Sequence, residues 1–329
     1  MNWTAETLTG IATDYWRSAA LIAAVELDLF EHLATSPRSL DQINAKLSAV
    51  PAHLCALLDA LCALQIATKT DAGYALAEAA APYLLSSSDR CMIDALRLNA
   101  SMYRMWGALG NCVREGSSAV PAKAHLGDDE TQTRIFVMGM HSRATAFAGK
   151  LTALIALEDR ASLLDIGSGP GTFSRALAAT NPSLAVTQFD LPGILAVARE
   201  LTPDDDIGRR ITFHPGDYRV DPLPGDFDAV LYCGALHQEN VHDAQHLFSR
   251  VLATLRPGGA LIVVDFMLNS DRTSPVFSAL FALNMLLVKP DSRVYTTEEV
   301  QDLLTQAGFT PATVEDHAPY SIIRTTRPQ

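Results

Sequence analysis

A short apolar run that leads into a glycine-rich turn, residues 163–172 (LLDIGSGPGT), constrains the fold more than any other stretch. The run predicts a buried strand, and the apolar spacing from Phe173 to Ala178 directly after the turn predicts a helix. A strand, a glycine turn and a helix in this order bring backbone close to a ligand, with the first turn of the helix facing it. An open α/β sheet with a binding site at this turn is therefore expected.

The spacing of the glycines narrows the choice of ligand. A dinucleotide-binding fingerprint requires G-x-G-x-x-G/A, and Thr172 stands where its last small residue should be. The pattern present is D-x-G-x-G-x-G, formed by Asp165, Gly167, Gly169 and Gly171. This pattern resembles motif I of class I S-adenosylmethionine-dependent methyltransferases. Alone, it is equally compatible with a βα loop of another doubly wound protein.

Three later segments fit the same sheet. Residues 185–190 form a second strand-like run that ends at Asp190, where an open sheet places a carboxylate for ribose hydroxyls. Asp217 and Tyr218 follow a third short strand and suit an adenine ring. Residues 255–265 read as a helix end, a Pro-Gly-Gly turn and a buried strand. All four segments in this order favour a methyltransferase sheet over another doubly wound fold.

Length, composition and charge exclude several classes of protein. The 329 residues are 48% apolar and allow two domains, but no uninterrupted apolar run is long enough to span a bilayer. The N-terminus lacks the blocks of a signal peptide, and the five scattered cysteines contain no C-x-x-C pair. A cytoplasmic protein with reduced thiols and no membrane partner is expected. The net charge of −12 argues against a nucleic-acid partner.

The first hundred residues predict a small helical domain. Residues 11–34 predict one apolar helix, and further helices are expected to begin after Ser39 and at Pro51. Residues 66–76 predict two short strands around a turn, which completes a winged-helix plan. The helix after Pro51, where a DNA reader would stand, is apolar and poor in Arg and Lys. Dimerisation or a scaffold role is therefore favoured over DNA binding.

With these segments in place, nearly the whole chain resembles the small-molecule O-methyltransferases of the caffeate, hydroxyindole and bacterial antibiotic-tailoring type. The resemblance implies a winged-helix-like dimerisation domain over residues 1–100 and a homodimer formed through it. A helical linker over residues 101–157 would contribute to the pocket. A Rossmann-like methyltransferase domain over residues 158–329 would bind S-adenosylmethionine and release S-adenosylhomocysteine.

The resemblance also implies roles for particular residues around the cofactor. The glycines would cradle its methionine and ribose part, with Asp165 beneath them, and Arg143 on the predicted helix 133–156 would pair bidentately with its carboxylate. Cys233 stands where the family has a lysine. The complete set of expected cofactor residues is Arg143, Asp165, Gly167, Gly169, Gly171, Asp190, Leu191, Asp217, Tyr218 and Cys233.

His237 matches the general base of the family. The family stretch Leu-His-Asp-Trp corresponds here to residues 236–239 (LHQE). In-line attack on a sulfonium methyl requires an acceptor that loses a proton and is held close, and a neutral imidazole accepts that proton near pH 7. The alternative is a plain loop histidine at a strand end. The family's acidic residue that orients the histidine has no clear match, and Glu239 and Asp291 are the candidates for that role.

The acceptor is expected to be a small hydroxylated molecule, aromatic or enolisable. The helices near Met140 and His141 and near Phe281, Asn284 and Met285 are expected to bind it. No metal is expected, because the pattern lacks clustered carboxylates for magnesium. Three alternatives stay open: transfer to carbon or nitrogen on the same scaffold, a homologue that binds the cofactor without methylating, and a winged-helix regulator.

Overall fold

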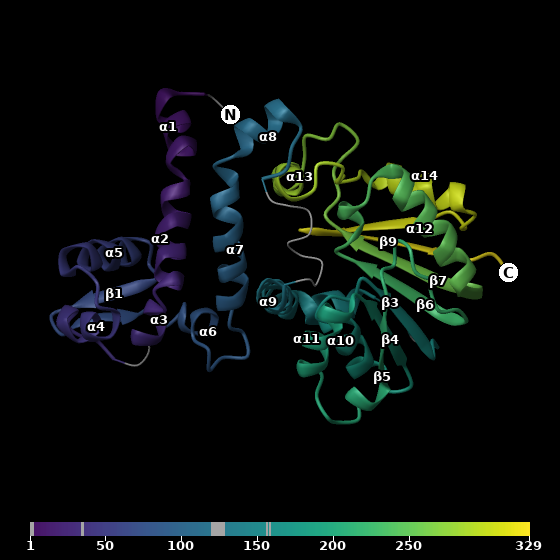
Figure 1. Cartoon of the computed structure of the whole chain (residues 1–329), viewed down its shortest axis with the longest axis horizontal. Coiled ribbons are helices and arrows are strands. Elements are labelled where there is room, and N and C mark those ends of the chain that lie inside the picture. The colour runs from purple at the N-terminus through teal and green to yellow at the C-terminus, as the bar shows by residue number, and fades with distance from the viewer. Residues whose placement is uncertain (1–2, 34–35, 120–128, 156, 158) are drawn as a thin grey trace. The chain divides into compact units, whose positions relative to one another are not determined.

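The computed structural model describes residues 3–33, 36–119, 129–155, 157 and 159–329. The chain divides into two compact units, residues 1–102 and 103–329 (Figure 1). The second unit includes the segment expected as a helical linker. The boundaries at 100 and 157 therefore stay predictions.

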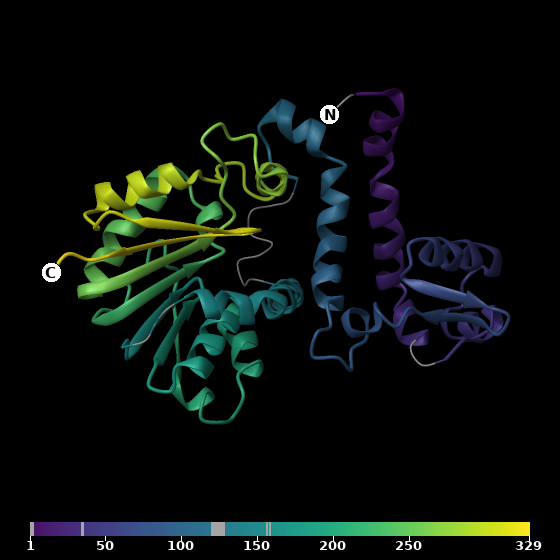
Figure 2. The same ribbon diagram turned by 180° about the vertical axis from the view of Figure 1, so that it is seen from behind.

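A seven-stranded mixed sheet forms the centre of the second unit. Its strand order is β5-β4-β3-β6-β7-β9-β8 (Figures 1 and 2). The first five strands run parallel to one another, and β9 runs antiparallel to both of its neighbours, β7 and β8. The expected Rossmann-like sheet and its final antiparallel pair are confirmed. The strands are β3 (Ser162–Ile166), β4 (Ala185–Asp190), β5 (Ile211–Pro215), β6 (Phe227–Cys233), β7 (Leu255–Asp265), β8 (Thr313–His317) and β9 (Tyr320–Thr326).

Helices cover both faces of this sheet. Alternate residues of β6 point to opposite faces, so Val230 packs with Phe248 and Leu304 while Leu231 packs with Leu177 on the other side. Burial on both faces explains why the central strands are continuously apolar. The helices of this unit are α8 (Leu109–Glu115), α9 (Glu130–Leu154), α10 (Thr172–Thr180), α11 (Pro192–Glu200), α12 (Val241–Thr254), α13 (Val276–Val288), α14 (Thr297–Ala307) and the 3₁₀ turns η1 (Gly208–Arg210) and η2 (Leu236–Gln238).

The strand order places the binding edge. The chain leaves β3 toward β4 on one side and returns to β6 on the other, so the order reverses at β3. The carboxyl ends of these parallel strands lie along one edge, which is where open α/β sheets bind ligands. The glycine-rich turn, Asp190, η2 and Asp265 all follow or end strands at this edge.

The Pro-Gly-Gly turn lies inside β7 rather than before it. Phe227 pairs with Leu255, and Ala229 pairs with Ala260, so residues 256–259 protrude as an irregularity in the ladder. The positive φ of Gly258, 74°, allows this excursion. The expected turn and strand therefore form one element.

The N-terminal unit contains a helical core and a small hairpin. The single helix expected over residues 11–34 is wrong: it breaks at Asp14 and again at Asp28, whose φ of 49° is left-handed, and residue 34 lies outside the described residues. The two strands expected over 66–76 pair antiparallel. Its elements are α1 (Ala5–Thr13), α2 (Tyr15–Glu26), α3 (Leu29–His32), α4 (Leu40–Leu47), α5 (Pro51–Ala63), β1 (Ala67–Thr70), β2 (Gly73–Leu76) and α6 (Ala81–Leu84), followed by α7 (Ile93–Trp106), which runs across the division.

The caps expected for the next two helices are confirmed. Ser39 and Gln42 form a capping box at the start of α4, and Pro51 occupies the first turn of α5. The buried residues of α5, Leu54, Leu58 and Leu61, pack into the core of the unit. The apolar character of α5 is therefore explained by core packing.

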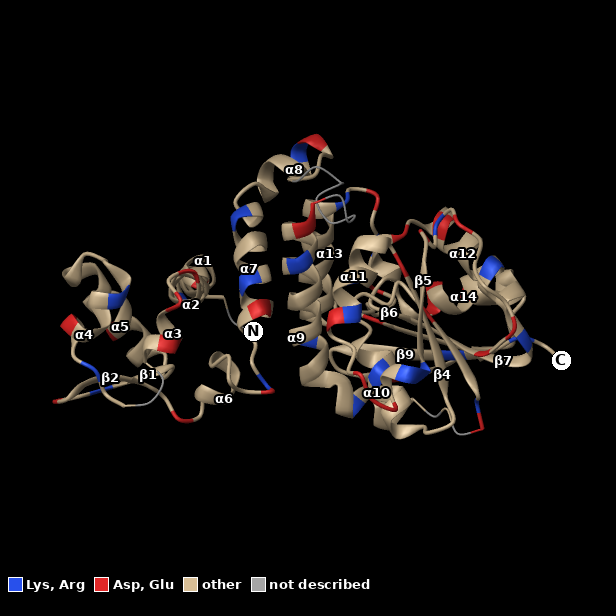
Figure 3. Ribbon diagram, turned by 60° about the horizontal axis from the view of Figure 1, so that its bottom comes forward, with Lys and Arg blue, Asp and Glu red and all other residues tan. Residues whose placement is uncertain are grey.

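Lys and Arg are interspersed with Asp and Glu along the helices and loops of both units (Figure 3). Within the described residues, no single helix is long and apolar enough to cross a membrane. Helices α4 and α5 reach that length and apolar composition only when taken together, and they are bent by 112° at their junction.

The cap of α14 gives a test of the fold. Thr296, one residue before the expected Thr297, is the cap: its Oγ1 accepts from Glu299 N at 3.2 Å, and Glu299 Oε2 accepts from Thr296 N at 2.9 Å. Thr296→Ala should lower the free energy of unfolding by about 1 kcal/mol. Urea denaturation measures this change, with Thr297→Ala as the matched control. An equal or larger loss in the control would contradict the assignment.

Candidate active site

The glycine-rich turn between β3 and α10 is an open backbone cradle. Gly167, Gly169 and Gly171 all have positive φ, at 63°, 54° and 67°, which non-glycine residues adopt at a cost. A Cβ at Gly171 would overlap the side-chain amide of Gln188. At Gly169 a Cβ would meet nothing within 4 Å, so the loop is open on that side. The turn therefore has the free backbone surface that a close-lying ligand requires.

A buried polar layer supports this turn from below. Asp165, at the end of β3, is buried, and burial raises its pKa to about 7. Arg175 on α10 is also buried, which lowers its pKa to about 10, and it donates to the carbonyl of Pro170 in the turn. Gln188 donates to Ser174 at 3.1 Å. Asp165 is thus a buried carboxyl in the strand that leads into the turn, and its expected place beneath the loop stays a prediction.

Asp190 ends β4 and contacts the glycine turn directly. Its Oδ2 accepts from Gly169 N at 2.7 Å, and its Oδ1 accepts from Leu191 N at 2.7 Å. Burial raises the pKa of Asp190 to about 6, although both backbone hydrogen bonds act in the opposite direction. The carboxylate and the open loop therefore lie side by side at the carboxyl edge.

Asp217 and Tyr218 follow β5, and Tyr218 reaches the glycine turn. Burial raises the pKa of Asp217, but hydrogen bonds from Arg219 outweigh this effect and leave the pKa lowered. The Tyr218 ring lies against Gly167, where a Cβ would be 3.3 Å from its Cε1. Its hydroxyl donates to Glu239 Oε1 at 2.7 Å. The ring is therefore next to the glycine turn and fixed at its hydroxyl.

His237 lies in η2, directly after β6, and is held by Asp265 at the end of β7. His237 Nδ1 is 2.8 Å from Asp265 Oδ1, and the backbone N–H of His237 donates to Asp265 Oδ2 at 3.1 Å. A carboxylate only accepts hydrogen bonds, so this contact assigns the proton of a neutral imidazole to Nδ1 and leaves Nε2 as an acceptor. A ring nitrogen that accepts protons and is oriented by a carboxylate is the arrangement of a general base.

Asp265 takes the position that the sequence left open. Glu239 bonds to Tyr218 instead, and Asp291 is exposed. The ends of β6 and β7 meet because the strands pair in parallel, with Cys233 opposite Val264. The sequence does show an acidic residue, Asp265, at the end of a predicted strand. It could be assigned to His237 only if β7 were known to lie beside β6.

Aromatic rings surround the imidazole. The Phe281 ring lies edge-on to His237, with centroids 4.8 Å apart, and Phe266 lies 4.7 Å from Phe281. Phe266 also stacks on Tyr320 at 4.7 Å and 18°. Phe281 was expected from the sequence, whereas Phe266 and Tyr320 were not. A ring-lined surface beside a base suits a planar apolar acceptor.

The other residues expected at the acceptor are spread more widely. Asn284 Oδ1 accepts from Trp106 Nε1 at 3.1 Å, and Met285 is buried in α13. His141 Nδ1 is 2.8 Å from Thr172 Oγ1, so this histidine adjoins the glycine turn. Met140 is half-buried on α9. Of the five expected residues, Phe281 is the one shown in contact with the His237 ring.

Arg143 and Cys233 complete the expected cofactor set. Arg143 is half-buried on α9; burial lowers its pKa, and Tyr320 acts in the opposite direction. Burial raises the pKa of the Cys233 thiol well above its usual value, and Asp165 and Asp265 add to this effect. Cys233 is therefore a neutral thiol where the family has a lysine. Across the described ranges, no group of three or more His, Cys, Asp or Glu side chains has metal-binding geometry.

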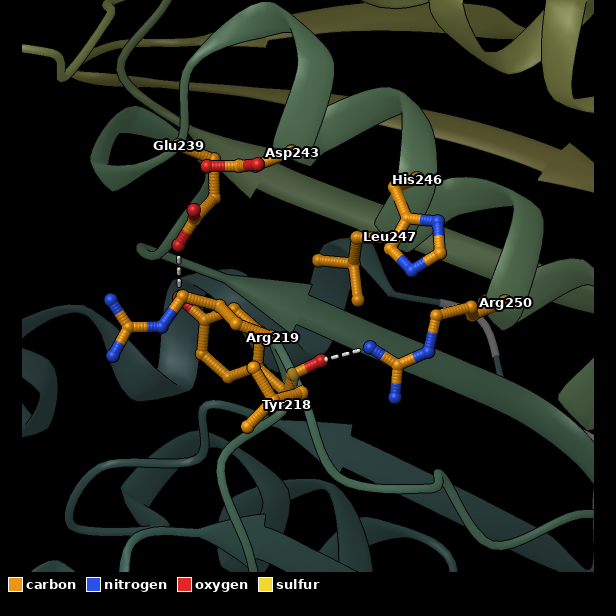
Figure 4. Close-up of a pocket in the computed structure, with 8 residues that line it drawn as sticks. Tyr218, Arg219, Glu239, Asp243, His246, Leu247 and Arg250 are labelled. Carbon is orange, nitrogen blue, oxygen red and sulfur yellow. Dashed lines mark hydrogen bonds between the residues drawn. The ribbon is translucent and has the colours of Figure 1, made fainter.

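A pocket of about 220 Å³ lies between the loop after β5 and α12 (Figure 4). Tyr218 lines this pocket and also contacts Gly167, so it adjoins both the pocket and the glycine turn. Arg250 donates to the Tyr218 carbonyl at 2.6 Å. The lining residues are Tyr218, Arg219, Val220, Glu239, Asp243, His246, Leu247 and Arg250.

Two family matches cover most of the chain. The O-methyltransferase domain family matches residues 106–310, and the O-methyltransferase dimerisation domain family matches residues 10–86.

Curated relatives and solved structures agree with these matches. The chain is 30% identical to the N,N-dimethyltransferase OxyT of Streptomyces rimosus, over 93% of this chain and 90% of the relative. It is also 30% identical to the tetracenomycin polyketide synthesis 8-O-methyl transferase TcmO of Streptomyces glaucescens, over 90% of this chain and 88% of the relative. The structure of human N-acetylserotonin methyltransferase in complex with SAM is 25% identical, with a TM-score of 0.91 over 100% of this chain and 99% of that chain. The protein is a methyltransferase and belongs to the O-methyltransferase family, with its dimerisation domain followed by its catalytic domain.

Proposed function

We propose that this enzyme transfers a methyl group from S-adenosylmethionine to a phenol or enol hydroxyl of a small aromatic metabolite, with His237 as the general base. The observation that carries the proposal is the 2.8 Å contact between His237 Nδ1 and Asp265 Oδ1 at the edge that also bears the glycine turn. Relatives named for 8-O-methyl transfer and for acetylserotonin O-methyl transfer support a ring-bearing acceptor.

The residues at this edge fit the cofactor. The open left-handed turn at Gly169 leaves room for a ligand against backbone, and Asp190 offers a buried carboxylate beside it for ribose hydroxyls. Asp217 and Tyr218 would contact the adenine, and Arg143 would pair with the carboxylate of the methionine part. When bound, S-adenosylmethionine supplies an electrophilic methyl group on a positively charged sulfur.

The protein's part in the reaction is to orient the acceptor and take its proton. His237 Nε2 accepts the hydroxyl proton, while Nδ1–H remains donated to Asp265. The Asp265 carboxylate stabilises the imidazolium that forms and keeps the ring from turning. Phe266 and Phe281 limit the freedom of a planar acceptor and keep water from the ring, which favours close approach.

The proposal includes a homodimer formed through the N-terminal unit. The dimerisation family match covers residues 10–86. Helices α1 and α2 expose large apolar side chains, among them Ile11, Tyr15 and Trp16, the last with 62% of its surface accessible. Apolar side chains gathered on one surface are typical of an association site. A second copy of the chain is the partner that the family match supports.

Transfer to nitrogen is a second candidate because the relative OxyT is named an N,N-dimethyltransferase. A free amine carries its own lone pair and needs less help from a base than a hydroxyl does. Aromatic acceptors that carry a hydroxyl and an amine separate the two, since mass spectrometry and NMR locate the labelled methyl group. If the enzyme methylates nitrogen, His237→Ala should leave most of that transfer in place.

Removing the base or its partner should abolish O-methylation and spare cofactor binding. We expect His237→Ala to lower kcat by about 100-fold or more, and Asp265→Asn to lower it in the same direction. Labelled S-adenosylmethionine with a panel of phenols and naphthols measures turnover, and calorimetry with S-adenosylhomocysteine measures affinity. His246→Ala, an exposed histidine on α12, is the matched control. Undiminished turnover of His237→Ala would overturn the base assignment.

The raised pKa of Asp190 predicts that the affinity for the cofactor depends on pH. A pKa of about 6 in the unliganded protein means that Asp190 is ionised at pH 7.5 and increasingly protonated below pH 6. Ribose hydroxyls donate to the ionised form, so the affinity for S-adenosylhomocysteine should fall as the pH drops through 6, approaching about tenfold per pH unit. Calorimetry from pH 5 to 8 checks this change.

In Asp190→Asn the step near pH 6 should disappear, and affinity should be weaker at pH 7.5. Asp302→Asn, an exposed carboxylate on α14, should keep the wild-type profile. A wild-type step that persists in Asp190→Asn would show that Asp190 does not hold the ribose.

A further inference from the structure

Glu239 is a buried carboxylate that the mechanism above does not use. It lies two residues beyond His237 and is only 1% exposed. Its Oε1 accepts from Tyr218, whereas its Oε2 has no hydrogen-bond partner among the described residues. Lys289 Nζ is 3.8 Å from Oε2. Burial of an incompletely bonded carboxylate is costly, so its retention calls for a reason beyond packing.

On one side, Glu239 connects to the glycine turn. The hydrogen bond from the Tyr218 hydroxyl to Glu239 is 2.7 Å long (Figure 4). The Tyr218 ring lies against Gly167. Arg250 holds the Tyr218 backbone at its carbonyl. Tyr218 is therefore held at its hydroxyl, at its ring and at its backbone carbonyl. The contact at the hydroxyl comes from Glu239, which belongs to the turn that carries His237.

On the other side, the turn over residues 236–239 is held by the segment that follows α13. The backbone N–H of Arg293 donates to the His237 carbonyl at 3.1 Å. Lys289 Nζ donates to the Gln238 carbonyl at 2.7 Å, and the Tyr295 hydroxyl donates to the Glu239 carbonyl at 2.9 Å. Three consecutive carbonyls thus bond to one segment, while the Glu239 side chain reaches in the direction of Tyr218.

We infer that Glu239 is a positioning residue for the methyl transfer: through its hydrogen bond with Tyr218 it fixes the His237 turn relative to the glycine turn. The inference rests on the proposed function, because it concerns the distance between the base and the methyl donor. A displacement of about 1 Å in such a geometry can cost about 100-fold in rate. Glu239 acts through the backbone of His237 and does not touch the reacting atoms.

The experiment compares Glu239→Ala with Asp302→Ala, an exposed carboxylate on α14. Glu239→Ala should lower kcat roughly tenfold or more, the loss expected for a hydrogen bond to a buried charge. The acceptor KM and the affinity for S-adenosylhomocysteine should change little. Glu239→Gln, which keeps an acceptor oxygen for Tyr218, should recover part of the rate. Asp302→Ala should behave as wild type.

A double-mutant cycle with Tyr218→Phe tests the hydrogen bond itself. Phe keeps the ring against Gly167 and removes only the donor, so Tyr218→Phe should lower kcat as Glu239→Ala does. The double variant should lose no more than the worse single variant, because both remove the same bond. Fully additive losses, or a kcat within twofold of wild type in the single variants, would overturn the inference.

Amide hydrogen exchange with bound S-adenosylhomocysteine separates this inference from the proposed function, because it needs no turnover. Glu239→Ala removes the hydrogen bond to Tyr218 and should speed amide exchange in residues 237–239, while residues 297–307 of α14 stay protected. Faster exchange in this turn with a fully active His237→Ala would leave Glu239 as a positioner and refute the base. Unchanged exchange with an inactive His237→Ala would refute the positioning role and keep the base. A uniform rise in exchange would indicate general destabilisation and also refute the positioning role.

Discussion

The site depends on the parallel register that brings the carboxyl ends of β3, β4, β6 and β7 to one edge. Pairing of Cys233 with Val264 sets β6 and β7 so that the residues just beyond them meet. The 2.8 Å contact between His237 and Asp265 follows from that register, and a slip of one residue would turn Asp265 to the opposite face. Apolar clusters on both faces of the sheet resist such a slip.

Buried polar groups follow the same edge, each bonded to an element that carries another part of the site. Asp190 accepts from the glycine turn, Asp265 holds the imidazole, and Glu239 accepts from Tyr218. Each burial costs free energy that hydrogen bonds only partly offset, so the sheet must supply the stability. The cost is consistent with a rigid site that orients its reactants before chemistry begins.

The sequence predicted features that are local and missed those that depend on strand order. The glycine turn and Asp190 were found because each lies at the end of its own strand. Asp265 was missed because its role appears only when β7 is known to lie beside β6. The break at Asp28 escaped prediction because a left-handed aspartate leaves no mark in an apolar periodicity. The cap of α14 was displaced by one residue because Thr296 and Thr297 are chemically equivalent until the hydrogen bonds are seen.

The proposed transfer requires Asp265 to hold His237 as a neutral imidazole whose Nε2 is free to take the proton of the acceptor. Nitrogen-15 NMR of histidine-labelled protein, bound to S-adenosylhomocysteine near pH 7.5, reports which ring nitrogen carries the proton. We expect a His237 signal with the proton on Nδ1 and an unprotonated Nε2, and we expect this pattern to change in Asp265→Asn. A proton on Nε2 with a bare Nδ1, or a ring that stays doubly protonated at this pH, would contradict this expectation.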